Sequence, residues 1–224
     1  MLQDEPFKSN TRRAVHDLRE LIFSGELEAG SDHLESELAE RLSMSRTPVR
    51  EATLMLEAQG LLEVRPRKGV RILALSADDM DEIYEVLTEL ESLAAALAAD
   101  AQYCKKDLNT LAKSIDDMEV AVTNEDRVAW AKADGDFHHE LVRLSKNSRI
   151  MAIVSNFNDQ VRRARMTTLH IRPLPKKSNE EHRALFEAIV SGDAKAARDI
   201  HWNHRTSARK MLTELLNGHG LKRI

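Results

Sequence analysis

The stretch at positions 35–72 reads ESELAERLSMSRTPVREATLMLEAQGLLEVRPRKGVRI. Its apolar spacing, turns and helix caps decide the fold of the first third of the chain. Apolar spacing predicts a short helix over 34–42 and a longer one over 46–59, separated by the turn SMS. Ser45 is placed to cap the longer helix, and Pro48 falls in its first turn, where proline costs no intrahelical hydrogen bond. The pattern is that of two helices joined by a tight turn.

The segments on either side of this pair complete a small domain. Residues 11–23 carry the apolar stripe of a preceding helix, and a loop rich in glycine and acid follows it. Residues 61–64 and 70–75, joined by RPRKG, predict a β-hairpin with a basic tip. Three helices followed by a hairpin wing predict a winged helix-turn-helix, and we place this domain at residues 1–75.

The start of the third helix carries side chains suited to DNA. This end of a helix-turn-helix enters the major groove, where arginine can bond guanine in bidentate fashion. A threonine hydroxyl and the helix N-terminus can hold phosphate, while basic side chains on a wing reach the backbone or the minor groove. The candidate DNA-binding residues are Ser45, Arg46, Thr47, Arg50, Arg67 and Lys68.

Charge and composition agree with this interpretation. The chain has 224 residues and a formal net charge of −4, yet seven basic residues and three acids lie between Arg41 and Arg71. A local basic patch attracts a phosphate backbone. The single cysteine, Cys104, excludes an internal disulfide framework. Without an apolar run of about 20 residues or a signal peptide, a cytoplasmic protein with no membrane contact is expected.

After residue 75 the sequence has long segments of helical apolar periodicity with few helix-breaking residues. Ser76 with Asp79, and Ser178 with Glu181, have the spacing of capping boxes that open helices. Helices are predicted near 76–101, 105–122, 125–144, 148–170, 178–190 and 193–216. We therefore predict a mainly α protein, in which residues 76–224 form a six-helix antiparallel bundle.

Helical phase selects polar residues inside this bundle. Asp134 and His138 are four positions apart and share one face with Leu141, whereas Asp136, Glu140 and Arg143 lie on a polar face that His139 flanks. His182 and His204 each lie on an apolar stripe of a later helix. Three imidazoles and a carboxylate suit zinc, or manganese, nickel or iron. Periodicity does not exclude His201 as a competing ligand.

The first domain resembles the DNA-binding domain of GntR-family bacterial transcription regulators. The resemblance lies in SRTPVREA, followed by LEAQGLL and a basic wing that ends in glycine. It implies operator contacts by Arg46, Thr47 and Arg50, with Gly69 and its neighbours in the wing. Ser36 stands where members of the family often carry arginine, so this chain departs from the pattern there.

The bundle resembles the FCD ligand-sensing domain of the FadR-type branch, with a helix count similar to the VanR-like subgroup. The matching pieces include YEVLTELESLAAALAA, DGDFHHELVRLSKN and SNEEHRALFEAIVSGDAKAA. In metal-binding members the ligand pattern is D-x3-H followed by one histidine in each later helix. By that resemblance the metal ligands are Asp134, His138, His182 and His204.

The resemblance also bears on the effector. Leu87 replaces an arginine that in many members helps hold a ligand carboxylate, so an anion contact is expected from a later run of arginines, unless this run is only solvated or caps a loop. The candidates are Arg162, Arg163, Arg165 and Arg172.

Three interpretations follow. The first is a homodimeric transcription regulator, a repressor, that binds double-stranded operator DNA. Its DNA binding is controlled by a small organic or sugar acid, which binds at or near a metal. One divalent metal is expected per chain, with zinc favoured. The second is a metal-dependent hydrolase or lyase with an appended DNA-binding domain. It is disfavoured because a general base would have to come from Asp134 itself or from an outward acid. The third is an architectural DNA protein, disfavoured by the polar groups that converge in the bundle.

Overall fold

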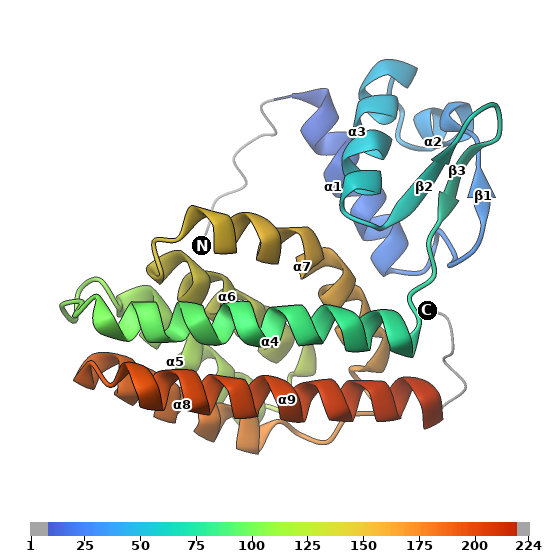
Figure 1. Ribbon diagram of the computed structural model, residues 1–224. Helices are drawn as coiled ribbons and strands as arrows, with labels where there is room; N and C mark the ends of the chain where they lie inside the picture. The colour runs from blue at the N-terminus through green and yellow to red at the C-terminus, as the bar shows by residue number, and fades with distance from the viewer. Residues whose placement is uncertain (1–8, 219–224) are drawn as a thin grey trace. The chain divides into compact units, whose positions relative to one another are not determined.

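The computed structural model of the protein describes residues 9–218, which divide into two compact units between Leu75 and Ser76. Positions 1–8 and 219–224, included in the two sequence-based domains, lie outside the described residues. Figure 1 shows the first unit in blue to teal and the second in green to red.

The first unit has three helices and a small antiparallel sheet. The helices are α1 (Asn10–Phe23), α2 (Glu35–Arg41) and α3 (Arg46–Ala58); the strands are β1 (Asp32–His33), β2 (Leu62–Arg65) and β3 (Gly69–Ile72), in the order β1-β3-β2. Leu18, Val49 and Leu56 of the helices and Ile72 of the sheet are fully buried in one apolar core. The winged helix-turn-helix architecture is confirmed.

Strand β1 lies in a segment that we predicted as a loop. Asp32 pairs with Arg71 and His33 with Val70, so β1 adds a third strand to the wing. A strand of two residues is too short for an alternating pattern to reveal it. Ser45 occupies the N-cap position of α3, but its side chain makes no capping hydrogen bond.

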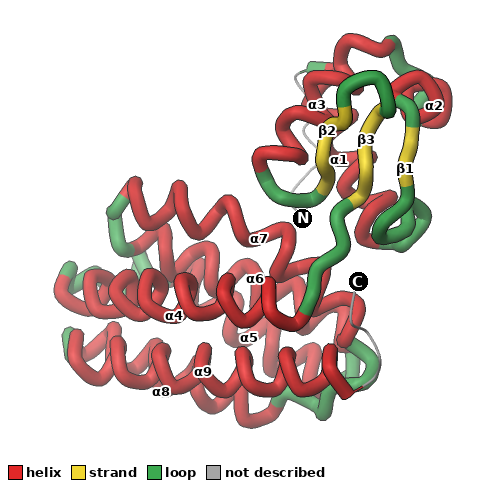
Figure 2. Tube along the Cα trace, turned by 45° about the vertical axis from the view of Figure 1, so that its right-hand side comes forward, coloured by secondary structure: helices red, strands yellow, loops and turns green. Residues whose placement is uncertain are grey.

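Residues 76–218 of the second unit form six helices, which confirms the mainly α fold. They are α4 (Ala77–Asp100), α5 (Asn109–Thr123), α6 (Arg127–Leu144), α7 (Ser148–Thr168), α8 (Lys176–Ser191) and α9 (Ala194–Gly218). The two longest, α4 and α9, lie side by side and run in opposite directions in Figures 1 and 2. Small side chains on α4, among them Ala95 and Ala98, pack against Phe137 and Leu141 of α6 in one buried cluster.

The two expected capping boxes have different outcomes. Ser76 and Asp79 form theirs, with the Asp79 amide donating to Ser76 Oγ at 3.0 Å. The prediction of a capping box at Ser178 is wrong, because α8 begins two residues earlier, with Pro175 in the N-cap position. The Glu181 carboxylate is instead engaged by His204 of α9.

No helix among residues 9–218 is both long enough and apolar enough to cross a membrane.

Candidate functional site

Three helices of the bundle bring four polar side chains to one point in its interior. Helix α6 supplies Asp134 and His138, α8 supplies His182, and α9 supplies His204; all four are buried. One ligand atom from each lies within 4.8 Å of the ligand atoms of the other three. The structure therefore brings together the four residues that the sequence indicated.

The atoms that face this point have no hydrogen-bond partners among the described residues. They are Asp134 Oδ1 and the Nε2 atoms of His138, His182 and His204, and His182 Nδ1 is also without a partner. Asp134 Oδ1 lies 3.7 Å from Nε2 of His138 and 3.7 Å from Nε2 of His182, too far for hydrogen bonds. Buried polar atoms are almost always satisfied, and each orphan costs free energy. Several such atoms around one point form a group that could hold a metal ion.

The outer atoms of the same side chains are fixed by charged neighbours. His138 Nδ1 lies 3.1 Å from Glu91 Oε2, and His204 Nδ1 lies 2.7 Å from Glu181 Oε2. A carboxylate that accepts from Nδ1–H leaves the lone pair on Nε2, which faces the common point. Arg165 forms an ion pair with Asp134 Oδ2 and leaves Oδ1 as the free oxygen.

Protonation in this environment also suits metal ligation. Burial, and then the charge of Arg205, lowers the pKa of His138 to about 3. Burial together with His204 lowers the pKa of His182 well below its usual value. Burial alone would raise the pKa of Asp134, but Arg165 and the facing histidines outweigh it and hold this pKa below its ordinary range. Near neutral pH the site thus offers the neutral imidazoles of His138 and His182 and the carboxylate of Asp134.

His201, the competing ligand, lies to one side of this group. Its Nδ1 is 3.2 Å from Ser92 Oγ, and its Nε2 is 3.4 Å from Glu91 Oε2. Glu91, His138 and His201 form a second cluster with metal-ligand spacing. The Glu91 carboxylate, however, is already engaged by Arg205 through both Nε and Nη2. This cluster therefore has fewer free ligand atoms than the first.

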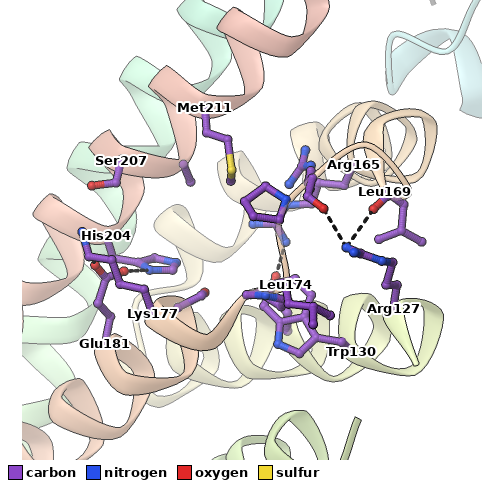
Figure 3. Close-up of a pocket in the computed structure, with 16 residues that line it drawn as sticks. Arg127, Trp130, Arg165, Leu169, Leu174, Lys177, Glu181, His204, Ser207 and Met211 are labelled. Atoms are coloured by element: carbon purple, nitrogen blue, oxygen red, sulfur yellow. Dashed lines mark hydrogen bonds and ion pairs between the residues drawn. The ribbon is translucent and has the colours of Figure 1, made fainter. Parts of the chain in front are cut away.

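A cavity of about 230 Å³ adjoins this cluster, and Asp134 and His204 form part of its wall. Figure 3 shows His204 among the side chains that line it. Arg172, in the loop between α7 and α8, also lines it. The Arg172 Nε donates to Thr168 Oγ1 at 2.8 Å, while its buried Nη2 has no partner among the described residues. Arg127 steadies the loop by donating to the Arg172 carbonyl at 2.8 Å. The cavity thus combines the cluster with a preorganised donor for an anion.

The predicted effector arginines are spread over different surroundings. Arg165 lines the cavity, but Asp134 holds its guanidinium. Arg162 lines a separate groove between α6 and α7, and Arg163 is buried and lines neither hollow. Helix α4 has the buried Leu87 at the position where many family members carry an arginine. Cations near the cluster come from other elements: Arg165 of α7 and Arg172 of the following loop line the cavity, and Arg205 of α9 pairs with Glu91.

The polar face predicted for α6 is partly wrong. His139 and Asp136 are exposed as expected, but Glu140 is buried. Its carboxylate accepts two hydrogen bonds from Arg143, at 2.6 and 2.7 Å, which compensates the lost solvation. Helical phase alone does not reveal such a local pair.

The predicted DNA-binding side chains lie at one edge of the first unit. Ser45, Arg46, Thr47 and Arg50 are exposed at the start of α3. Arg67 and Lys68 are exposed at the tip between β2 and β3, where Gly69 begins β3. A cleft of about 300 Å³ lies between the start of α3 and the wing, and Arg46, Arg50 and Arg67 line it.

Sequence reasoning missed Glu91, Glu181 and Arg205 and did not single out Arg172. Glu91 lies four residues after Leu87, on the buried face of α4, so an acid on an apolar stripe was its only signal. Glu181 had been assigned to a helix cap. The pairing of these groups depends on how the helices are rotated against each other, which their sequences do not state.

Comparison with known families assigns both parts of the chain. Residues 10–72 match the family described as bacterial regulatory proteins, gntR family, and residues 82–207 match the FCD domain. An uncharacterised HTH-type transcriptional regulator, YdhC of Bacillus subtilis, is 31% identical over 201 residues, covering 88% of this chain and 89% of the relative. A probable D-xylose utilization operon transcriptional repressor of Paenarthrobacter nicotinovorans is 32% identical, covering 82% and 80%.

A solved structure, E. coli McbR/YncC, is similar with a TM-score of 0.78 and 22% identity, covering 92% of this chain and 98% of that one, which supports the fold. These relatives are transcriptional regulators, and the enzyme interpretation is not supported. The chain belongs to the GntR family of bacterial regulatory proteins, and its second unit carries an FCD domain.

Proposed function

We propose that this regulator is a cytoplasmic, homodimeric repressor whose binding to operator DNA is controlled by a small carboxylate bound beside a metal. In this proposal residues 1–75 are the DNA-binding domain and residues 76–224 the effector-binding and dimerisation domain. The observation that carries it is the set of buried atoms on Asp134, His138, His182 and His204 that have no hydrogen-bond partner among the described residues.

The DNA contacts are assigned to the exposed edge of the first unit. Arg46 and Arg50 would read bases in the major groove, with Ser45 and Thr47 near phosphate at the start of α3. Arg67, Lys68 and the Gly69 backbone would contact the DNA backbone or the minor groove from the wing. A second copy of the chain would double the phosphate contacts and make binding steeply dependent on salt.

One divalent metal fits the four-residue cluster. Three imidazole nitrogens and one carboxylate oxygen have no hydrogen-bond partner among residues 9–218 and face a common point, and Glu91 and Glu181 orient two of the imidazoles. This donor set suits zinc, and also nickel, manganese or iron. The metal would supply a positive centre that attracts an effector oxygen.

A carboxylate effector fits the adjoining cavity because Arg172 lines it together with Asp134 and His204, and the Arg172 Nη2 has no hydrogen-bond partner among the described residues. A planar guanidinium suits carboxylate recognition. Arg165 serves in this proposal as a positioning residue, because its charge holds Asp134 ionised. Arg172 therefore replaces Arg162 and Arg163 as the proposed effector contact.

Named relatives support a repressor that senses sugar-derived acids. The gluconate operon transcriptional repressor of Bacillus subtilis is 27% identical and covers 85% of this chain. The relative from Paenarthrobacter nicotinovorans is named a probable repressor of D-xylose utilization. We propose the same sign of regulation here, with a small organic or sugar acid as effector.

Metal analysis of the purified protein, followed by a thermal-shift screen of organic acids, tests the proposal. The expected result is one divalent metal per chain and a stabilising acid that releases operator DNA. His182→Ala should lose the metal and the response to acid together, while it retains DNA binding. His139→Ala is the matched control and should keep both, because His139 is exposed. Full metal content in His182→Ala would overturn the assignment.

A further inference from the structure

A groove of about 480 Å³ between α6 and α7 is not used by the proposed function. Among residues 9–218, Arg165 is the one residue that lines both this groove and the cavity of Figure 3. Of the four proposed metal ligands, His138 alone lines the groove. The groove is therefore a separate hollow, with its own chemistry at the bottom and along its walls.

Arg205 of α9 lines this groove and is only 3% exposed. Its Nε donates to Glu91 Oε2 at 2.9 Å, and its Nη2 pairs with the other Glu91 oxygen. These contacts fix the guanidinium, yet its buried Nη1 has no partner among the described residues. An unpaired charged donor that is already held in place is a ready contact for an anion.

Apolar side chains form part of the walls, beside charged residues that include Asp136, Asp159 and Lys132, of which Lys132 and Asp136 pair with each other at 2.8 Å. Val154, Val161 and Met166 of α7 line one side, and Val154 and Val161 are buried. A fully hydrated anion such as phosphate gains nothing from such walls, whereas a carboxylate attached to a hydrocarbon buries its chain against them. The combination of one free guanidinium edge and apolar sides selects for an amphiphilic acid.

Gly135 is a second, independent sign that the groove is kept open. It lies inside α6, where glycine is less favourable than alanine by about 1 kcal/mol. Neither backbone nor packing demands glycine here, because its φ is not positive and an added Cβ would meet no atom within 4 Å. Its missing side chain instead leaves space in the groove that it lines.

We propose that this groove is a second ligand site, which binds a small aliphatic or aromatic monocarboxylate. The carboxylate accepts from Arg205 Nη1, and the hydrocarbon lies along Val154, Val161 and Met166. The site is separate from the effector cavity proposed above, and it keeps its ligand when the metal cluster is disabled.

Titration calorimetry with hexanoate on the purified full chain tests this site. The wild type should bind hexanoate, and Gly135→Leu, which fills the groove, should bind it at least about tenfold more weakly, a loss of ~1.4 kcal/mol. Ala129→Leu is the matched control: it adds the same side chain at an exposed position of α6 outside the groove and should bind as the wild type does. Equal affinity in Gly135→Leu, or no binding by the wild type, overturns the proposal.

Two further measurements test which site binds hexanoate and whether the ligand has to be amphiphilic. His182→Ala should keep hexanoate binding; if binding is lost there and kept in Gly135→Leu, hexanoate binds at the metal cluster and the second site is wrong. Inorganic phosphate should not compete, and effective competition would overturn the assignment to an amphiphilic acid. Should Gly135→Leu fail to fold, the Met166 methyl resonance of the wild type decides: hexanoate should shift it, and no shift at saturation contradicts the proposal.

Discussion

The winged-helix unit and the helical bundle hold their candidate functional groups in opposite ways. At the start of α3, Arg46 and Arg50 are exposed, and the core beneath them is apolar. In the bundle, Asp134 and His182 are buried, and their inner atoms have no partners. A surface that meets a polyanion can keep its charges solvated until contact, whereas a site that takes a small ion has to be desolvated in advance. Removal of a functional side chain should therefore leave stability unchanged at the start of α3 and alter it in the buried cluster.

The largest effect is expected for Asp134→Ala. This change leaves Arg165, which is largely buried, without its counter-ion. Breaking a buried ion pair from one side costs about 3–5 kcal/mol in the free energy of unfolding. Urea denaturation of metal-free protein measures it. The double variant Asp134→Ala/Arg165→Met is the control and should recover most of the loss; no recovery would show that the ion pair is not the cause.

Gly69→Ala should have the next largest effect, through the wing. Gly69 has φ +85°, and a Cβ there would lie 2.1 Å from the His33 carbonyl oxygen, so β1 and β3 could not keep their contact. We expect a loss of about 3 kcal/mol and of operator binding, from positive φ and displaced strands together.

Gly25→Ala provides the matched comparison for Gly69. Its φ is +79°, but its added Cβ meets nothing within 4 Å, so only the backbone strain of about 1 kcal/mol remains. Denaturation curves and mobility shifts of both variants measure the difference. Equal losses in the two variants would contradict the close approach of β1 to Gly69.

Arg46→Ala should weaken operator binding by about 2 kcal/mol while stability stays within about 0.5 kcal/mol of the wild type, since an exposed arginine that reads a base contributes nothing to the core. Fluorescence anisotropy on operator and on random DNA separates specific from general binding. A change in melting temperature with unaltered DNA binding would reverse the roles assigned to the two units.

Glu181→Gln should have a smaller effect, confined to metal affinity. The Glu181 carboxylate accepts from His204 Nδ1 at 2.7 Å and fixes Nε2 as the free atom. Loss of such an orienting carboxylate reduces metal affinity about 10–100-fold. Competition with a fluorescent chelator measures it, with Glu180→Gln as the control on the neighbouring exposed residue. Unchanged affinity would show that His204 needs no orienting partner.

The contrast between the units also explains what the sequence predicted well. The order of helices and wing in the first unit follows from local signals, namely turns, caps and apolar stripes. The four residues of the cluster were found because Asp134 and His138 share a helical face, and because His182 and His204 interrupt apolar stripes. These are properties of single helices.

What the sequence did not reveal depends on contacts between elements. Strand β1 exists only because β3 pairs with it. Glu181 contacts His204 and does not cap the start of its helix, and Glu140 is buried and paired with Arg143. Arg172 stands out among the arginines because the α7–α8 loop points it into the cavity. Each of these depends on distances between segments that periodicity does not encode.

The melting temperature of His182→Leu, with and without added zinc, tests the central claim most directly. Both ring nitrogens of His182 are buried without hydrogen-bond partners in the described part of the chain, so an apolar side chain of similar size should stabilise the metal-free protein by about 1 kcal/mol. The account predicts a wild type that melts higher when zinc is added, and a variant that melts higher than the wild type without zinc and does not respond to it. A variant that still gains stability from zinc, or a wild type that gains none, would contradict the claim that these buried atoms form a metal site.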